Sequence, residues 1–390
     1  MFIKTLSKNK WFKYLLKSIL LFIALIALFF ASIYFGLWGK VPSISQLKNL
    51  KQSQASLVLD VNNNLIGKYY IYDRQSIPYS DFPKHLINAL IATEDARFYE
   101  HHGIDTKSLF RVLFKTILTA NESSGGGSTI TLQLAKNLFG RKDFGSLSII
   151  VNKIKESIVA TRIESLYSKE EILTFYLNTV PFPDNTYGIE SSSMKFFNVH
   201  AKQLNITQAA TLIGSLKANN SYNPRLFPER SRSRKDVVIN QMEKYGYLSP
   251  EEASKNRASN IVLNYQYYAP NQGLAPYFRA EIKKQLDSIL QQEKFKKPDG
   301  EAYNIFQDGL KIYTTLDNTM QRYAENAMRD HLSKLQELYE KAYGQNAPWL
   351  KNKPTFKASE KHLKKYKTLK SLNLTKKEIE DSLKKPEKKE

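Results

Sequence analysis

A charge-free apolar run near the N-terminus constrains the fold of this chain more than any other feature. Residues Ser18–Trp38 read SILLFIALIALFFASIYFGLW, and about 20 apolar residues are enough for a helix to span a bilayer. The segment before the run is basic, with Lys4, Lys8, Lys10, Lys13 and Lys17. Because basic flanks stay in the cytoplasm, we expect 1–17 to be a cytoplasmic tail, 18–38 a transmembrane anchor, and the rest of the chain to lie outside the cytoplasm.

A cleaved signal peptide is the alternative interpretation of this run. The apolar region of a signal peptide is about 7–15 residues long and is followed by a small-residue cleavage site. Here the run is longer and ends in Tyr34-Phe35-Gly36-Leu37-Trp38. The sequence therefore favours an uncleaved, single-pass anchor.

Composition narrows the possible partners. The 390 residues carry a formal net charge of +21 and contain no cysteine. A basic excess favours anionic partners, such as lipid headgroups or phosphate-bearing substrates. The anchor argues against nucleic acid, since the bulk of the chain would not meet it. The lack of cysteine excludes disulfides, thiolate metal sites and a cysteine nucleophile.

The chain after the anchor divides into a short β-prone part and a long helical part. We assign 39–79 to a juxtamembrane connector and a hairpin, because Ser56–Asp60 and Leu65–Tyr72 are β-prone and flank the turn signal Asn62-Asn63-Asn64. From 80 to 260 the apolar spacing is mostly helical. The fold class predicted here is mainly α.

The C-terminal part mixes helix and strand. We predict a helix over Pro276–Leu290, a strand over 309–316 and a long amphipathic helix over Asn318–Tyr343. Residues 351–390 are rich in lysine, a composition typical of a solvated, partly disordered tail. An apolar stripe over 109–118 fits either core packing or a segment that dips into the membrane interface.

Two adjacent carboxylates mark the first candidate site. Glu94 and Asp95 end an apolar helical run and are followed closely by Phe98, His101 and Gly103. This pattern fits the edge of a catalytic cleft. It also fits an ordinary solvated helix end, because charged residues are usually exposed.

A glycine-rich loop opens the second candidate site. In GGGSTITLQLAKNLF, over residues 125–139, Ser128 or Thr129 can cap a helix. Gln133, Lys136 and Asn137 then lie on one face of that helix. Glycine N–H groups at a helix start, with a lysine nearby, suit a phosphate, although an ordinary capped helix gives the same pattern.

A third set of polar residues follows at helical spacing. Lys153 and Glu156 lie one turn apart, and Lys155 and Arg162 are on or beside the same helix. A second helix begins at Ser168, with Glu171 completing a capping box. Glu156 is either functional or the partner of a helix salt bridge to Lys153, which is worth about 0.2–0.5 kcal/mol.

Together these segments resemble the glycosyltransferase domain of family 51, the peptidoglycan polymerase module of class A penicillin-binding proteins. The first family motif, Glu-Asp-x-x-Phe-x-x-His-x-Gly, is met by Glu94, Asp95, Phe98, His101 and Gly103. The second is met by Gly126, Ser128, Thr129, Ile130, Gln133, Leu134, Lys136 and Asn137, with Leu132 where the family has glutamine.

The remaining three motifs follow in the family's order. The third, Arg-Lys-x-x-Glu, is met by Lys153 and Glu156, with Asn152 in place of arginine. The fourth is complete in Lys169, Ile172, Leu173, Tyr176, Leu177 and Asn178. The fifth appears as Arg234, Val238 and Ile239.

The resemblance implies a lysozyme-like helical glycosyltransferase domain over 80–260, behind the transmembrane helix, with a small α/β C-terminal segment. It implies polymerisation of lipid II into β-1,4 glycan with release of polyprenyl pyrophosphate, and it assigns the general base to Glu94 and a second catalytic role to Glu156. Residues expected to bind or orient substrate are Asp95, Phe98, His101, Ser128, Thr129, Gln133, Lys136, Asn137, Lys153, Lys155, Arg162 and Arg234.

The resemblance also implies cofactors, partners and a location. No cofactor is required, although Glu156 could act through a divalent cation such as Mg²⁺ or Mn²⁺. Expected partners are lipid II, the nascent glycan strand, membrane lipid and cell-wall synthesis proteins including a transpeptidase, with no nucleic acid. The expected location is the inner (cytoplasmic) membrane, with the catalytic domain extracytoplasmic.

Residues 261–350 are similar to the linker and the opening of a penicillin-binding transpeptidase domain, through Ala275–Phe278 and Gly309–Gln321. No Lys-Thr-Gly or Lys-Ser-Gly occurs in the sequence, and a transpeptidase needs such a motif. We therefore expect no transpeptidase activity and a truncated or partial version of a bifunctional protein. Two other functions stay open: a catalytically weakened scaffold that binds glycan or lipid II, and a lysozyme-like glycan hydrolase.

Overall fold

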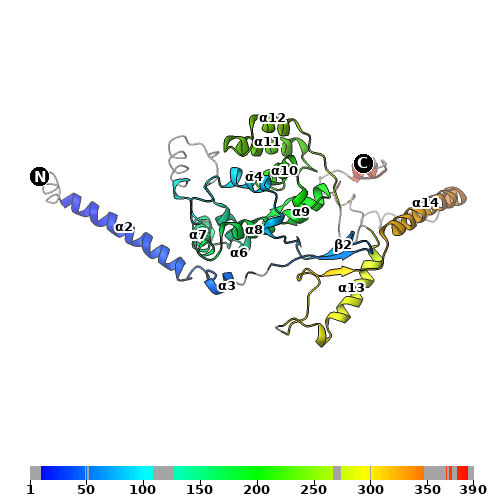
Figure 1. Cartoon of the computed structure of the whole chain (residues 1–390), viewed down its shortest axis with the longest axis horizontal. Coiled ribbons are helices and arrows are strands. Elements are labelled where there is room, and N and C mark those ends of the chain that lie inside the picture. Colours follow the sequence, from blue (N-terminus) through cyan, green and yellow to red (C-terminus); the bar gives the residue numbers. More distant parts are fainter. Residues whose placement is uncertain are drawn as a thin grey trace. The chain divides into compact units, whose positions relative to one another are not determined.

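The structure is a computed structural model that describes residues 10–48, 50, 52–108, 127–266, 274–298, 300–346, 366, 369–370 and 376–384. The chain divides into two compact units, Met1–Leu316 and Asp317–Glu390. Within the described ranges the chain is mainly α with two small sheets, as the sequence predicts (Figure 1). Gly126 and the apolar stripe over 109–118 lie outside the described residues.

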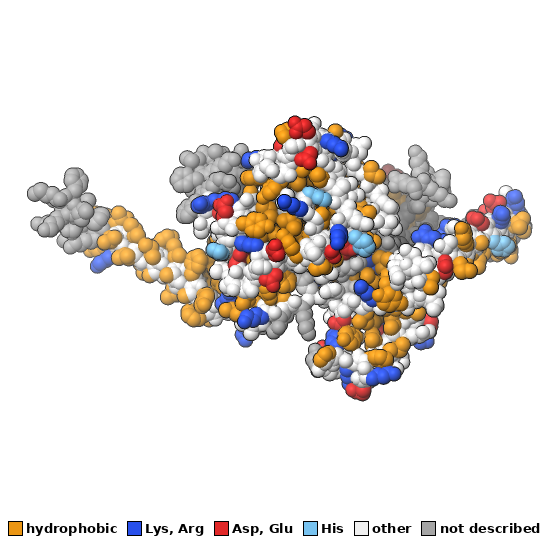
Figure 2. All heavy atoms as spheres, viewed as in Figure 1, with side chains coloured by type: hydrophobic (Ala, Val, Ile, Leu, Met, Phe, Trp, Pro, Cys, Tyr) orange, Lys and Arg blue, Asp and Glu red, His pale blue; other side chains and the backbone are white. Residues whose placement is uncertain are grey.

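The N-terminal apolar run forms the helix α2 (Lys10–Tyr34), which Figure 2 shows covered with hydrophobic side chains. Its segment Tyr14–Tyr34 is long and apolar enough to cross a membrane. The helix ends at Tyr34, four residues before the predicted span does, because Gly36 and Gly39 adopt positive φ values of 83° and 91°. Trp38 folds back, and its indole N–H donates to Ser32 Oγ at 2.9 Å.

One hydrophobic core joins the helices of the central part of the chain. Helix α10, which is buried on nearly all sides, packs against α4 and α11, and α6 packs against α7 and α8. The helices are α3 (Ile44–Lys48), α4 (Lys84–Glu94), α6 (Ile130–Phe139), α7 (Ser148–Leu166), α8 (Lys169–Thr179), α9 (Ile189–Phe197), α10 (Ile206–Ser215), α11 (Pro228–Lys244) and α12 (Pro250–Ala258).

Capping side chains fix where two of these helices begin. Thr129 caps α6 by accepting a hydrogen bond from the Leu132 backbone N–H at 3.1 Å. Ser168 and Glu171 form the predicted capping box at α8, with bonds of 3.2 and 2.7 Å. These bonds satisfy N–H groups that the first helical turn leaves without partners.

The predicted hairpin is present, and it belongs to a larger layer. Strands β1 (Ser56–Leu59) and β2 (Leu65–Tyr69) pair antiparallel, and β6 (Lys311–Tyr313) pairs parallel with β1. Helix α13 (Pro276–Leu290) packs against this sheet. The hairpin and the C-terminal α/β segment, which the sequence analysis placed in separate parts of the chain, therefore share one small core.

A second small sheet lies beside the helical core. It contains β3 (Asp73–Arg74), β5 (Thr186–Tyr187) and β4 (Pro181–Phe182), in that order. In the second unit, α14 spans Asn318–Tyr343 as predicted, and α18 spans Lys376–Lys384. Asp317 caps α14 by accepting from the Met320 backbone N–H at 2.9 Å.

Candidate active site

Glu94 is the last residue of α4, whose apolar face anchors it in the core. Gln133, in the first turns of α6, donates to Glu94 Oε2 at 2.9 Å and accepts from the Tyr176 hydroxyl at 2.9 Å. Burial raises the pKa of the Tyr176 phenol, and the nearby Glu94 carboxylate raises it further. Tyr176 therefore stays a neutral donor, and it fixes the amide that orients a half-buried Glu94.

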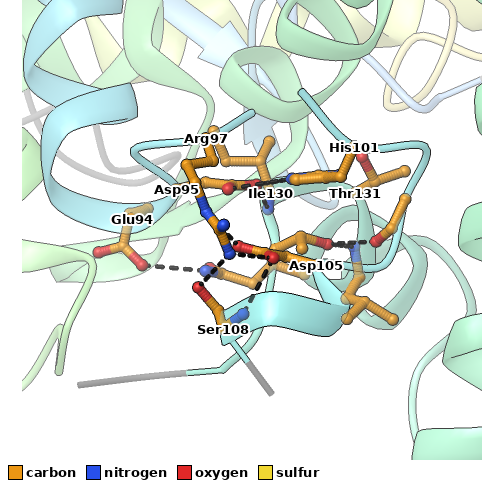
Figure 3. Close-up of polar contacts among 12 residues, drawn as sticks. Glu94, Asp95, Arg97, His101, Asp105, Ser108, Ile130 and Thr131 are labelled. Carbon is orange, nitrogen blue, oxygen red and sulfur yellow. Dashed lines mark hydrogen bonds and ion pairs between the residues drawn. The ribbon is translucent and has the colours of Figure 1, made fainter. Parts of the chain in front are cut away.

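Asp95, unlike the half-buried Glu94, points its carboxylate into the protein interior. Its buried carboxylate accepts from His101 Nε2 at 3.0 Å and from the Ile130 backbone N–H at 3.0 Å. Figure 3 shows the Glu94 carboxyl apart from this Asp95–His101 pair. Phe98 is fully buried. Asp95, Phe98 and His101, which the resemblance assigned to substrate, thus lie in the interior and support the position of Glu94.

A buried ion pair ties the first, second and fourth motifs together. Lys169 lies 2.8 Å from the carboxylate of Glu164, which also accepts from Thr131 Oγ1 at 2.6 Å. The same ammonium donates to the His101 carbonyl at 2.6 Å and lies 4.3 Å from the centre of the Phe98 ring. The turn after Glu94 is therefore held against α8.

The turn after Glu94 also needs glycine at its end. Gly103 has a φ of 90°, and a Cβ there would lie 3.1 Å from the backbone of Ala160 in α7. The hydroxyl of Thr129 donates to the Gly103 carbonyl at 2.6 Å. Thr129 thus caps α6 and also bonds the turn that ends at Gly103. Ser128, the residue before it, is half-buried.

Glu156 forms the second part of the site, on α7. Its side chain is only 5% exposed and meets Lys153 Nζ at 3.4 Å, so the helix salt bridge anticipated from the sequence is present. Arg141 lies closer, with Nε at 2.7 Å and Nη2 at 3.2 Å from the two carboxylate oxygens. The sequence analysis missed Arg141, because it comes 15 residues earlier, in the loop before α7.

The start of α6 connects the two carboxylates. Ser128, just before α6, accepts from Lys153 Nζ at 3.3 Å, and Gln133, in the same helix, binds Glu94. Lys136 is exposed and Asn137 half-exposed on this helix. The structure therefore brings Glu94, Ser128, Gln133, Lys153 and Glu156 into one region.

Lys155 and Arg162 face the anchor instead. Lys155 donates to the Trp38 carbonyl at 3.1 Å, and Arg162 donates to the Pro42 carbonyl at 2.6 Å. Burial lowers the pKa of Lys155, and the nearby Lys142 adds to this effect. Both residues lie on α7 with Glu156, as the sequence predicts, and their role in binding substrate stays a prediction.

Arg234 also has other contacts. Its Nε donates to the Gly214 carbonyl at 3.3 Å, and its guanidinium lies 5.9 Å from the centre of the Tyr222 ring. These contacts join α11 to α10. Of the cations expected to bind substrate, Lys153 contacts Ser128 just before α6, and Lys136 is exposed in the last turn of α6.

Comparison with known proteins identifies the family of this part of the chain. Residues 62–243 match the family model described as "Transglycosylase". These residues form a family 51 transglycosylase domain.

Relatives of the whole chain are larger proteins. The chain is 34% identical over 284 residues to penicillin-binding protein 1F of Bacillus subtilis, covering 73% of this chain and 38% of that protein. It is 32% identical over 294 residues to penicillin-binding protein 1A of Escherichia coli, covering 75% and 32%. The chain thus spans less than two fifths of the length of these relatives.

A solved structure also shows a likeness, at a low level. It is a crystal structure of penicillin-binding protein 1A from Haemophilus influenzae, with 19% identity, coverage of 71% of this chain and 29% of that one, and a TM-score of 0.38. A score this low supports no argument about the fold, which rests on the helices and strands described above.

The described residues include no group of three or more His, Asp or Glu side chains that could hold a metal ion. Glu156, the residue expected to act through Mg²⁺ or Mn²⁺, has Arg141 and Lys153 at its oxygens. A cation ligand would compete with both.

Arg97, within the first motif, forms an ion pair with Asp105, two residues after that motif, and Ser108 donates its backbone N–H to Asp105 at 3.0 Å (Figure 3). Burial alone would raise the pKa of Asp105. The hydrogen bonds from Arg97 and Ser108 outweigh burial and lower the pKa from 3.8 to about 2.

We predict that Lys169→Met lowers the free energy of unfolding of the transglycosylase domain by about 3 kcal/mol or more, because it leaves the Glu164 carboxylate buried without its cation. The Glu164 side chain is 3% exposed. Denaturant unfolding in detergent measures the change. Lys202→Met is the matched control: it breaks the exposed Lys202–Asp81 pair and should cost less than about 1 kcal/mol. Equal losses would contradict the prediction.

We predict that Asp105→Asn destabilises the domain in a pH-dependent way. The folded pKa of about 2 lies below the ordinary 3.8, so the ionised group stabilises the fold fully above about pH 4 and loses this effect as pH falls through 2. The expected loss at pH 7 is up to about 2 kcal/mol. Unfolding at pH 7 and pH 3, with Asp330→Asn on α14 as control, tests this; a loss independent of pH would refute it.

Proposed function

We propose that this chain is a membrane-anchored peptidoglycan glycosyltransferase that polymerises lipid II into β-1,4 glycan strands and releases polyprenyl pyrophosphate. The observation that carries the proposal is the setting of Glu94. One carboxylate oxygen is oriented by Gln133 of α6 at 2.9 Å, while the side chain stays partly exposed. A base that removes a proton from a sugar hydroxyl needs this combination of orientation and access.

The reaction is a direct displacement at the anomeric carbon of the donor. The acceptor hydroxyl gives its proton to Glu94, and its oxygen forms the new bond to that carbon. The bond from the same carbon to the diphosphate oxygen breaks, and the electron pair leaves on the polyprenyl pyrophosphate. Attack from the face opposite the leaving group inverts the α-linked donor to a β-1,4 linkage.

The departing diphosphate needs cations and N–H donors. Lys153 lies at the entry to α6, where its ammonium reaches Ser128, and Lys136 is exposed on the same helix. The positive end of a helix adds to this field. A divalent cation such as Mg²⁺ or Mn²⁺ would supply further positive charge to the diphosphate.

The anchor places the site near its lipid-linked substrate. Lys155 and Arg162 of α7 bind carbonyl groups at Trp38 and Pro42, just beyond the end of α2. We propose that α2 crosses the inner (cytoplasmic) membrane once and that the transglycosylase domain is extracytoplasmic, in contact with membrane lipid. Cross-linking of the product would fall to a transpeptidase among the cell-wall synthesis proteins.

Two other functions make different predictions from the same geometry. A retaining hydrolase needs two carboxyl groups about 5–5.5 Å apart, one on each side of the bond that breaks. Asp95 does not supply the second, because its oxygens bind His101 and Ile130 in the interior. A weakened scaffold that binds lipid II or glycan draws support from Asn152, which stands where the family motif has arginine.

We predict that Glu94→Gln lowers polymerisation by at least about 100-fold, since a positioned general base contributes about 10²- to 10⁴-fold. The assay incubates the purified chain in detergent with lipid II and separates glycan polymer from substrate. Glu170→Gln is the control, because Glu170 is exposed on α8 and should leave the rate unchanged.

Each outcome of this assay selects one function. Polymer made by the unaltered chain and lost with Glu94→Gln supports the glycosyltransferase. Cleavage of finished glycan supports the hydrolase, and lipid II binding without turnover supports the scaffold. Full activity in Glu94→Gln would refute Glu94 as the base while leaving the reaction itself standing.

A further inference from the structure

The loop between α6 and α7 brings an arginine onto the second glutamate of the site. Arg141 contacts both oxygens of Glu156, through Nε at 2.7 Å and Nη2 at 3.2 Å. A guanidinium has five N–H donors in one plane, and this fork-to-fork contact uses only one edge of it. The other N–H groups can donate to a second anion without losing Glu156.

The exposure of the two partners differs sharply. The Arg141 side chain is 41% exposed, whereas Glu156 is 5% exposed. The Glu156 carboxylate is therefore the buried partner of the ion pair, and the Arg141 guanidinium is the partner that solvent or a ligand can reach. Lys153, 44% exposed and 3.4 Å from the same carboxylate, adds a second accessible cation. Two positive groups on one negative group leave a net positive surface beside Ser128.

Asn152 holds the loop that carries Arg141. This residue is buried, and its side-chain oxygen accepts from the Lys142 backbone N–H at 3.1 Å. Its amide N–H groups donate to the Lys142 carbonyl at 2.8 Å and to the Ser148 carbonyl at 2.7 Å. Asn152 thus supplies no charge, but its side chain bonds both the backbone N–H and the carbonyl of Lys142, the residue next to Arg141.

The other arginine candidates have contacts elsewhere. Arg162 binds the Pro42 carbonyl and stacks on Tyr34, and Arg234 binds the Gly214 carbonyl and stacks on Tyr222. Arg141 is thus the arginine that the described residues place beside Glu156.

We propose that Arg141 is the arginine that binds the departing diphosphate in this chain, with Glu156 and Asn152 as positioning residues. The assignment rests on the proposed glycosyltransferase function. When the bond from the anomeric carbon to the diphosphate oxygen breaks, its electron pair goes to that oxygen, and Arg141 donates N–H hydrogen bonds to the new charge. The guanidinium keeps its protons throughout, because its pKa lies far above neutral pH. A planar fork suits a phosphate better than a lysine point charge does.

The test compares variants of Arg141 with the unaltered chain, each purified in detergent. Arg141→Ala should lower the polymerisation kcat by about 10²- to 10³-fold, as does the loss of one donor to a developing oxyanion. Inorganic pyrophosphate should inhibit this variant at least about tenfold more weakly than it inhibits the unaltered chain. Arg141→Lys keeps a cation on Glu156 and should fall between the two in both measurements.

Arg257→Ala is the matched control. Arg257 also pairs with a glutamate, Glu243, at 2.5 Å, and both side chains are 32% exposed, but the pair joins α11 to α12 away from Glu156. This variant should keep the kcat and the pyrophosphate inhibition of the unaltered chain. Unfolding midpoints of all variants show whether each one is folded, and Arg141→Lys preserves the test if the alanine variant is not.

A double variant separates substrate binding from simple neutralisation of a buried charge. If Arg141 only neutralises Glu156, then Arg141→Ala combined with Glu156→Gln should regain the rate and the pyrophosphate inhibition of Glu156→Gln alone. Under the proposal, the double variant stays as weak toward pyrophosphate as Arg141→Ala. Recovery in the double variant would overturn the assignment.

The inference and the proposed function fail in distinguishable ways. If the unaltered chain makes polymer and Arg141→Ala matches it in rate and inhibition, Arg141 is wrong and the glycosyltransferase stands. If the unaltered chain makes no polymer, the proposed function fails. Direct calorimetric titration with pyrophosphate then still decides whether Arg141 forms a diphosphate site, with equal affinity in the alanine variant counting against it.

Discussion

The buried carboxylate of Asp95 is the contact on which the rest of the site depends. It binds His101 in the turn after α4 and the Ile130 N–H at the start of α6. A carboxylate at a helix N-terminus satisfies an N–H group that has no partner within the helix, and it interacts favourably with the helix dipole. One side chain thereby fixes the end of α4, the following turn and the start of α6 relative to one another.

The end of α4 also explains how adjacent acids take different roles. Glu94 is the last helical residue, and Asp95 leaves the helix with φ −157° and ψ 73°. In a continuing helix the two carboxyl groups would diverge only around the axis and both would stay near the surface. The change in backbone direction instead turns Asp95 inward, toward His101, and leaves Glu94 beside Gln133. The sequence shows that Glu94 and Asp95 are adjacent, but the backbone angles at Asp95 are needed to see that Glu94 is the carboxylate left partly exposed.

Local features of the sequence were predictable and long-range ones were not. The capping box at Ser168 and the bounds of α14 follow from residues a few positions apart, so periodicity and capping rules identify them. The pairing of β1 with β6 joins residues about 250 positions apart, and the Arg141–Glu156 pair links a loop to a helix. No local pattern encodes such contacts, because they depend on how the intervening chain folds. The contacts of Lys155 and Arg162 with the Trp38 and Pro42 carbonyls are of the same long-range kind, since they join residues about 120 positions apart.

Helix phase shows what α7 does in the molecule. Lys153 and Glu156 lie one turn apart on the face that meets the start of α6, while Lys155 is about 200° around the axis from Lys153. Arg162, seven residues after Lys155, returns to the face of Lys155, where both side chains bind the chain that follows α2. One helix thus carries cations of the site on one side and contacts to the anchor on the other. Because a helix is stiff over this length, a shift of the segment after α2 would move Glu156 and Arg141 with it. The contacts of Lys155 and Arg162 therefore tie the proposed diphosphate site, through α7, to the chain that follows α2.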